Sequence, residues 1–574
     1  MATIARPALP ALPARRWTQQ ALARPVLVAL VVALVAGPLV VLIHTSLLPP
    51  RSLPFTALSA TVENYVRIFA QSDTYYLVLN TLWYAGGTVM LAVAVATTIA
   101  WLTERTDLPL RRTVRILMFS WMAVPPLVFA FGWILLLNPG NGAINALLKG
   151  LFGLDHSPLS IYSMWAMIAI TGLSLVPTTF VMISGVLHNM DSQLENAATV
   201  SGAGRLTVLR RVTLPLLSPG ILSVAIYLFM VMVQAFDVAL AIGLTARVPV
   251  LSTRIYVLST ADSGLPDYGL SAAFGVVLMM FALGLMWCYF RVVRVGEKFR
   301  VVTGKAFRPR RLPLRRWRPL AIGFVAVYFA VMFLPLLLLL WTSLLPFYQT
   351  PSLESLAALS FAKYADVLSQ TTVQRALGNT LILVFVSATA VMVLSGLISW
   401  YSVRTKGRAG KLLDALAFTP IAVPNIVIAM AILMLYLHTP LHGTVWLLVL
   451  AHVTIFIAFG TRTMNAALLQ IHQELENAAT VSGAPWATTL RRIILPILWP
   501  QFVNGWLWVV AHSARDLTVP LMLMTTGNLV FSSLLWLMWQ YPNAPGAAAL
   551  SMMMMAGLMA LVVPAQILTA RGSD

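Results

Sequence analysis

Twelve apolar runs, each long enough to cross a lipid bilayer, constrain this chain more than any other feature. They lie near residues 25–48, 76–101, 114–137, 161–187, 216–243, 270–290, 319–345, 376–402, 413–437, 444–468, 499–524 and 546–570. A transmembrane helix takes about 20 mostly apolar residues. Hydrocarbon offers the backbone no hydrogen-bond partner, so such a run crosses the bilayer as a helix. The sequence therefore predicts an all-α integral membrane protein with about 12 transmembrane helices.

The charged residues agree with a membrane location. Only 10% of the 574 residues are charged, whereas a soluble chain carries about 25%. A net charge of +20 would suggest a nucleic-acid partner in a soluble protein. Here the basic residues lie between the apolar runs, so the lipid bilayer is the expected partner and no nucleic acid is expected.

The positions of the basic residues predict the orientation of the chain. Most of the 38 Lys and Arg residues lie in every second connecting segment, namely 1–24, 102–115, 188–215, 294–318, 403–412, 469–498 and 571–574. Basic segments favour the cytoplasmic side of a membrane, so these segments and both termini are expected to be cytoplasmic. The run 25–48 is longer than a signal-peptide core, so it is expected to remain as the first transmembrane helix.

The chain contains an internal repeat. Residues 80–82 (Asn-Thr-Leu) recur as 379–381, and the ten residues 194–203 recur without change as 475–484. Each copy holds six predicted spans. Because six is an even number, both copies face the same way, and the repeat is parallel rather than inverted.

The repeat divides the chain into four parts. They are a cytoplasmic N-terminus (1–24), a first repeat of six spans (25–293), a basic linker (294–318) and a second repeat of six spans (319–574). The linker carries ten Lys and Arg residues. It is expected to lie against anionic lipid head groups, although a regulatory or nucleic-acid-binding patch is an alternative.

Both copies of the ten-residue match lie in long connecting segments, 188–215 and 469–498. Nearly 30 residues is long for an unstructured connection, and Ala197, Ala198 and Ser201 recur at helical spacing. The glycine that follows suits a helix C-terminus. The sequence predicts two short helices joined at glycine, with a face of small residues that a partner can approach closely.

The spacing of this loop resembles a known motif. Ala197-Ala198, three residues and Gly202 are followed, after nine residues, by an aliphatic residue, one further residue and Leu-Pro at 214–215. The second copy has the same spacing. This pattern is similar to the EAA loop of permease subunits of ATP-binding-cassette (ABC) importers. The whole chain resembles the fused two-half permeases of that family, most closely those for iron(III).

The resemblance implies the type I importer fold, also called the MetI-like permease fold, and a docking role for the loops. In that family the loop forms a coupling helix that docks in a groove of an ATPase subunit. The docking residues implied are Glu195, Asn196, Ala197, Ala198, Gly202, Glu476, Asn477, Ala478, Ala479 and Gly483. Asn196 and Asn477 stand where the family has glutamate, so the side chain that meets the ATPase is left open.

The chain has no ATP-binding motif of its own. Ala306 follows Gly304-Lys305 where a Walker A motif requires Ser or Thr. The resemblance therefore implies a transport subunit, not an enzyme, with no cofactor of its own. It implies two partner ATPase subunits that bind ATP and Mg²⁺, a periplasmic solute-binding protein, and a place in the bacterial cytoplasmic (inner) membrane. Iron(III) is the first substrate expected, with thiamine, a polyamine or an aminophosphonate as alternatives.

A charge within a span is costly and marks a functional candidate, and three ionisable residues of the fifth and eleventh runs are singled out on this ground. They are Asp237 in the run 216–243, and Arg515 and Asp516 in the run 499–524. We expect them to line or gate the pathway, with Asp237 and Asp516 facing one another between the halves. The alternative is that Arg515 pairs with a nearby carboxylate and serves packing alone.

No catalytic or metal site is predicted. His438 and His442 are four residues apart, but Pro440 breaks the helix that would align them. His452 and His512 are isolated in the sequence, and local hydrogen bonding is expected of each. The absence of a titratable cluster disfavours a membrane enzyme or scaffold. An ion-coupled secondary transporter is the main alternative, but it has no need of two identical docking loops.

Overall fold

The computed structural model describes residues 25–55, 59–188, 197–198, 200–260, 265–297, 313–404, 408–541 and 543–571, and its regular structure in these ranges is helical. The helices of the first repeat are α2 (Gly37–Ser46), α3 (Glu63–Ala70), α4 (Ser72–Arg105), α5 (Arg111–Trp121), α6 (Pro126–Leu137), α7 (Ala143–Phe152), α8 (Met164–His188), α10 (Arg205–Val208), α11 (Leu214–Val233), α12 (Leu251–Ser259) and α13 (Tyr268–Glu297).

The second repeat follows the same order. Its helices are α14 (Arg318–Ser343), α15 (Leu353–Leu356), α16 (Ala362–Ser369), α17 (Thr371–Arg404), α18 (Arg408–Phe418), α19 (Asn425–Tyr436), α20 (Val445–Gln470), α21 (Gln473–Val481), α22 (Trp486–Thr489), α23 (Leu495–Arg515), α24 (Thr518–Met522), α25 (Phe531–Gln540) and α26 (Ala544–Arg571). π-Helical turns lie at Val32–Ala36, Leu209–Thr213, Ala239–Gly243 and Leu490–Ile494, and 3-10 turns at Arg315–Trp317 and Thr419–Ala422.

In the described part of the chain, ten helices are long and apolar enough to cross a membrane, and two further spans are bent. The bent spans lie in the runs 114–137 and 413–437, each of which was predicted to cross the membrane as one helix. Each divides into two helices that meet at 100° in the first half and 109° in the second. The breaks lie at Pro125 and Pro424, whose backbones are extended. Proline disfavours a helical residue before it and has no N–H to donate, which explains the shared break.

The fifth span of each half is also shorter than predicted. α11 ends at Val233 and α23 ends at Arg515, whereas the apolar runs continue to 243 and 524. The chain then leaves the helix for two or three residues and resumes as a short helical segment in each half. Asp237 and Asp516 therefore lie at helix breaks and not inside continuous spans.

The repeated Asn-Thr-Leu sequence has the same structural role in both halves. Thr81 Oγ1 accepts a hydrogen bond of 2.9 Å from the N–H of Leu251, the first residue of α12. Thr380 Oγ1 accepts one of 2.9 Å from the N–H of Phe531, the first residue of α25. The asparagine before each threonine donates to a carbonyl two residues before that helix. Both motifs thus satisfy backbone groups at a buried helix N-terminus.

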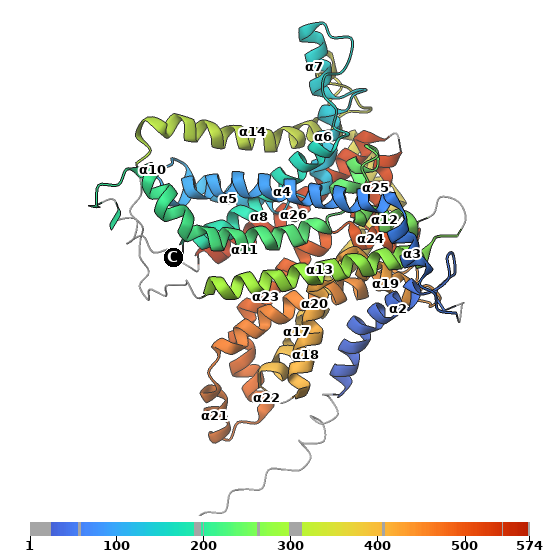
Figure 1. Cartoon of the computed structure of the whole chain (residues 1–574), viewed down its shortest axis with the longest axis vertical. Coiled ribbons are helices and arrows are strands. Elements are labelled where there is room, and N and C mark those ends of the chain that lie inside the picture. The colour runs from blue at the N-terminus through green and yellow to red at the C-terminus, as the bar shows by residue number, and fades with distance from the viewer. Residues whose placement is uncertain are drawn as a thin grey trace, which may run out of the picture.

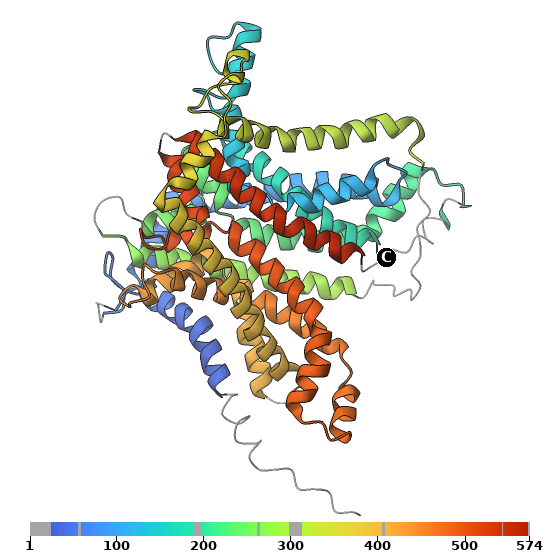
Figure 2. The same ribbon diagram turned by 180° about the vertical axis from the view of Figure 1, so that it is seen from behind.

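The first span of each half joins the two halves together. α2 contacts α13 in its own half and α19 in the other, and α14 contacts α26 in its own half and α6 in the other. Figures 1 and 2 show α14 lying along the helices of the first half. Beyond α14, the Tyr348 hydroxyl donates to the carbonyls of Leu135 (3.1 Å) and Asn141 (2.8 Å). Burial raises the pKa of Tyr348 to about 12, so the phenol stays protonated as a donor.

The long helices of the two halves diverge toward one end. Figure 1 places α10, α21 and α22 at this end, which we call the loop end, and α3, α12 and α25 at the opposite end. Both views show α4, α8 and α11 splaying away from α17, α20 and α23 toward the loop end. Apolar side chains of both halves share one buried cluster where the helices converge.

The contact between α6 and α14 predicts a site of steric sensitivity between the halves. A Cβ atom added to Gly132 of α6 would lie 2.5 Å from the carbonyl oxygen of Pro335 in α14. We expect Gly132→Val to destabilise the protein by about 1–3 kcal/mol, because a backbone atom cannot move aside easily. The measurement is the thermal unfolding midpoint of the purified protein in detergent.

Gly323→Val supplies the matched control, because Gly323 lies in α14 with no atom within 4 Å of an added Cβ. The control should unfold at the native midpoint. Equal midpoints for the two variants would show that the halves do not depend on this close approach.

Candidate functional site

The first repeated loop closes with a tight turn at glycine. Ala197 and Ala198 are helical, and Gly202 has a φ of +82°. The N–H of Ser201 donates to the carbonyl of Ala197, and the N–H of Ala203 donates to that of Ala198, each at 3.0 Å. This is the hydrogen-bond pattern of a helix that ends at a left-handed glycine. Two of the predicted docking residues, Glu195 and Asn196, lie outside the described residues.

The second loop has the same geometry one repeat later. Gly483 has a φ of +75°, and the N–H of Ala484 donates to the carbonyl of Ala479 at 3.0 Å. In α21, Asn477 and Ala478 are exposed while Ala479 is buried. Glu476 is half-buried, and its carboxylate lies 2.9 Å from the guanidinium of Arg404. The prediction of a short helix that ends at glycine is therefore correct in the second loop.

Two valines in the loops are more exposed than nearly all other apolar residues that the structure describes. Val200 is 88% exposed and Val481 is 89% exposed. They occupy equivalent positions of the ten-residue repeat. An apolar side chain held out at a helix end fits a contact with another protein. Neither valine was predicted to be a docking residue, although both lie in the ten-residue sequence that the two loops share.

Each loop leads into the next span through a widened helical turn. The π-helical turns Leu209–Thr213 and Leu490–Ile494 follow α10 and α22 and join α11 and α23 without a gap. Pro215 and Pro496 lie in the first turn of those long helices. Proline has no N–H for the carbonyl one turn back, which lies inside the π-helical turn. The loop and the following span are thus joined by a local widening of a continuous helix.

A polar cluster lies where α23 ends, between the two halves. The Arg515 guanidinium donates to the Met122 carbonyl of the first half (2.5 Å) and meets His512 Nε2 at 2.8 Å. Asp516 lies 3.1 Å from His452 Nε2 and accepts a hydrogen bond from a backbone N–H of α24. His452 is fully buried. His512 makes the expected local hydrogen bond, with the carbonyl of Trp508 one turn earlier at 2.9 Å. His452 does not, because its partner Asp516 lies 64 residues away in the sequence.

Asp237 approaches this cluster from the first half. Its charge interacts electrostatically with those of Asp516 and Arg515. Among the described residues, Asp237 has no hydrogen-bond or ion-pair partner. The two aspartates follow the ends of equivalent helices, but not at matching positions of the repeat: Asp237 corresponds to Thr518, and Asp516 to Ala235. The three predicted pathway residues are thus close enough to interact, and their role stays a prediction.

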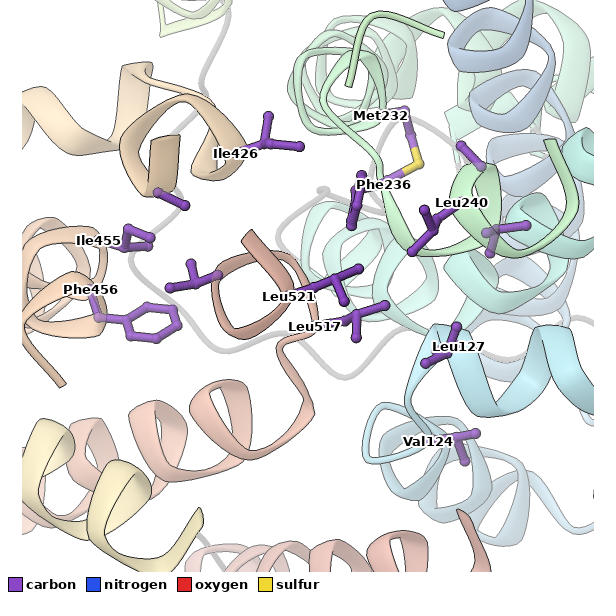
Figure 3. Packing of buried hydrophobic residues seen from close by; sticks show 14 of the residues in the cluster. Val124, Leu127, Met232, Phe236, Leu240, Ile426, Ile455, Phe456, Leu517 and Leu521 are labelled. Carbon is purple, nitrogen blue, oxygen red and sulfur yellow. The ribbon is translucent and has the colours of Figure 1, made fainter. Parts of the chain in front are cut away.

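Apolar side chains of both halves also meet near the helix breaks, where Phe236 and Leu517 directly adjoin Asp237 and Asp516 in the chain. Figure 3 shows Leu517 and Leu521 of the second half pointing toward Leu240 and Leu127 of the first half. All four residues are at most 3% exposed and belong to one buried cluster, together with Phe236. Water is excluded from such packing. The two halves are therefore sealed against each other at this level.

No group of three or more His, Cys, Asp and Glu residues that could hold a metal ion is found in the part of the chain that the structure describes. His438 and His442 lie in the turns after α19, which ends at Tyr436, so no helix aligns them.

Two parallel six-span units with matching loops and an interlocked interface define a two-half membrane transport protein. Residues 89–294 and 392–570 each match the family described as "Binding-protein-dependent transport system inner membrane component". The chain therefore belongs to this family of ABC-importer permeases and carries its domain twice.

Two curated relatives and one solved structure illustrate what the chain is similar to. The ferric transport system permease protein FbpB of Actinobacillus pleuropneumoniae is 23% identical over 479 residues, which cover 82% of this chain and 67% of the relative. The spermidine/putrescine transport system permease protein PotC of Haemophilus influenzae is 26% identical over 251 residues, 44% of this chain and 96% of the relative. One solved structure is the crystal structure of a bacterial alginate ABC transporter in complex with an alginate pentasaccharide-bound periplasmic protein. It matches at a TM-score of 0.37 and 19% identity, and the match covers 50% of this chain and 97% of the transporter chain.

The left-handed glycines predict a substitution that loosens the loops. Gly202 and Gly204 both have open space around an added Cβ, but only Gly202 has a positive φ. A side chain in the left-handed conformation costs about 1–2 kcal/mol. We expect Gly202→Ala to speed amide hydrogen exchange at Ser201 and Ala203 by about five- to thirtyfold.

Gly204→Ala is the control and should leave the exchange rates of these amides unchanged. Mass spectrometry of peptides from the purified protein gives both rates. Identical behaviour of the two variants would mean that backbone conformation does not hold this turn.

Proposed function

We propose that this chain is the membrane-spanning subunit of an ATP-driven importer, and that each loop docks one ATPase subunit. The observation that carries this proposal is the loop that occurs twice with one geometry, at one end of the helices, with an exposed valine in each copy. Two identical surfaces suit two identical partners. ATP and Mg²⁺ bind to those partners, and the permease chain itself holds no cofactor.

The basic segments support an orientation in the bacterial inner membrane in which the loop end and both termini face the cytoplasm. In this orientation, ATP binding draws the two ATPase subunits together, and the loops follow them. The widened turns that join loops to α11 and α23 carry the movement into the halves. A periplasmic solute-binding protein then delivers the solute at the opposite end.

The described conformation corresponds to an inward-facing resting state in this scheme. The long helices splay toward the loop end, and apolar side chains seal the halves where they converge. Closing the loop end must break the contact of Arg515 with the Met122 carbonyl or carry both groups together. Asp237, Arg515 and Asp516 then act as the charged gate that the solute passes.

We propose iron(III) as the substrate, because the similarity to a ferric transport permease extends over 82% of this chain. Thiamine, a polyamine or an aminophosphonate fits the same mechanism, and the relative PotC belongs to a spermidine/putrescine system. The described residues near the gate offer two carboxylates beside one guanidinium, too few groups to hold a solute tightly. In this proposal, selectivity therefore belongs to the solute-binding protein.

One observation favours an ion-coupled secondary transporter as the second candidate. The buried His452 beside Asp516 is a pair that a proton-driven transporter could use. The two candidates differ in their energy source. Uptake into vesicles by an ATP-driven importer requires ATP inside the vesicles and continues when the proton gradient is collapsed. Uptake by a proton-driven secondary transporter stops when the gradient is collapsed.

The exposed valines give the first test of docking. We expect Val200→Glu with Val481→Glu to abolish co-purification of ATPase subunits, because each change places a charge in an apolar contact. The native chain should carry two ATPase copies per permease, measured by quantitative gel densitometry or native mass spectrometry.

Leu353→Glu is the control, because Leu353 is 87% exposed but lies outside the loop end. It should retain both ATPase copies. If the double valine variant also retains them, the loops do not dock through these residues. If the folded native chain never carries an ATPase, the importer proposal fails.

The gate is tested through Asp237, whose carboxylate has no partner among the described residues. We expect Asp237→Asn to lower uptake of radioactive iron(III) citrate about tenfold in cells that produce the whole transporter, because the charge balance with Arg515 is lost. ATPase co-purification should be native.

Asp366→Asn, which alters an exposed surface ion pair with Lys363, serves as the control and should take up iron normally. Native uptake by Asp237→Asn would remove this residue from the gate. Uptake of radioactive spermidine by the native chain, without uptake of iron(III), would replace iron with a polyamine as the substrate.

A further inference from the structure

We propose that Arg404 and Glu476 form a strut that fixes the second docking loop to the membrane-spanning helices and transmits its movement. Arg404 is the last residue of α17, and Glu476 lies in α21. The proposal rests on the proposed function of the loops as docking sites. It assigns the two side chains to positioning and not to contact with the ATPase.

The strut joins three elements at one guanidinium. The Nε atom of Arg404 lies 2.9 Å from Oε1 of Glu476, off the direction of a hydrogen bond, so charge attraction holds this contact. The Nη2 atom donates to the carbonyls of Ile471 (3.0 Å) and Leu468 (3.4 Å) at the end of α20. These carbonyls belong to a helix C-terminus, where a cation is favoured. α17, α20 and the loop helix therefore meet at Arg404.

α21 has little apolar packing to hold it in place. Ala479 is its one buried residue. The side chains of Arg404 and Glu476 are only 12% and 20% exposed, so water screens their attraction less than at an open surface. A helix with so little burial moves with the membrane-spanning helices only if a polar contact ties it to them.

The arginine half of the strut recurs in the first repeat. Arg105 ends α4 as Arg404 ends α17, and it is 4% exposed. Its guanidinium donates to the carbonyl of Leu187 at 2.9 Å, at the end of α8. Leu187 and Leu468 are equivalent positions of the repeat. Each half thus places a largely buried arginine where the end of the second span meets the end of the fourth span.

The strut assigns separate tasks to neighbouring residues of α21. Glu476 turns inward to Arg404, whereas Asn477 and Ala478 are exposed. The asparagine that stands in the family's glutamate position is therefore the polar residue presented to a partner. Glu476 acts through Arg404 on the span, which makes it a positioning residue.

Glu476→Gln tests the strut, and Glu474→Gln is the control, because Glu474 is an exposed acid of the same helix. We expect Glu476→Gln to keep both ATPase copies while uptake per ATP hydrolysed falls about five- to tenfold, the range of a typical coupling free energy. Glu474→Gln should match the native chain in both measurements. Loss of the ATPase in Glu476→Gln alone would place Glu476 in the docking contact and overturn the proposal, as would unchanged uptake.

Exchanging the two charges tests whether Arg404 and Glu476 act as a pair or independently. Arg404→Glu should uncouple uptake from ATP hydrolysis, and adding Glu476→Arg should restore part of the coupling, because the two charges again attract. If the double variant is no better than Arg404→Glu, the residues act independently and the strut is refuted. If the native chain binds no ATPase at all, the proposed function fails. Faster hydrogen exchange in α21 of Glu476→Gln then still reports whether the tether exists.

Discussion

The need to satisfy every backbone polar group inside hydrocarbon governs this structure. Unbroken helices meet this need by themselves, but the breaks in the third and fifth spans do not. At the first of these breaks, Arg515 of the other half donates to the free carbonyl of Met122. At the helices that follow the fifth spans, Thr81 and Thr380 accept from the first N–H groups. Irregular backbone thus occurs where the protein itself supplies the partners.

These breaks are also places where the halves meet. The bent third spans bring their broken ends to the interface, and the first span of each half packs against the other. The polar cluster and the apolar seal both form from residues at or beside the breaks. A two-half machine that must open needs contacts that differ between its states. Helix ends with exchangeable partners supply such contacts, whereas continuous buried helices do not.

Much of the fold and of the loops was predictable from the sequence because the signals are local. Apolar runs report transmembrane helices, and the identical ten residues in both halves report one local structure used twice. Gly202 and Gly483 were expected at helix ends for the backbone conformation that they adopt. The third spans are not the single helices that were predicted, because the proline of each Ala-Val-Pro sequence separates two helices, whereas Pro177 lies inside a continuous one. The roles of His452 and Arg404 were not predictable, since their partners lie 64 to 72 residues away.

The sequence by itself determined that this chain is a twelve-run, parallel two-half membrane protein and where its repeated loops lie, because hydropathy, charge bias and repetition depend on neighbouring residues alone. Only the tertiary structure decided which charges meet. Arg515 reaches the first half, Asp237 approaches Asp516 without matching it in the repeat, and Glu476 turns to Arg404 instead of outward. The physical reason is that electrostatic contacts are set by the packing of distant helices, and one repeated sequence can be packed into two different surroundings.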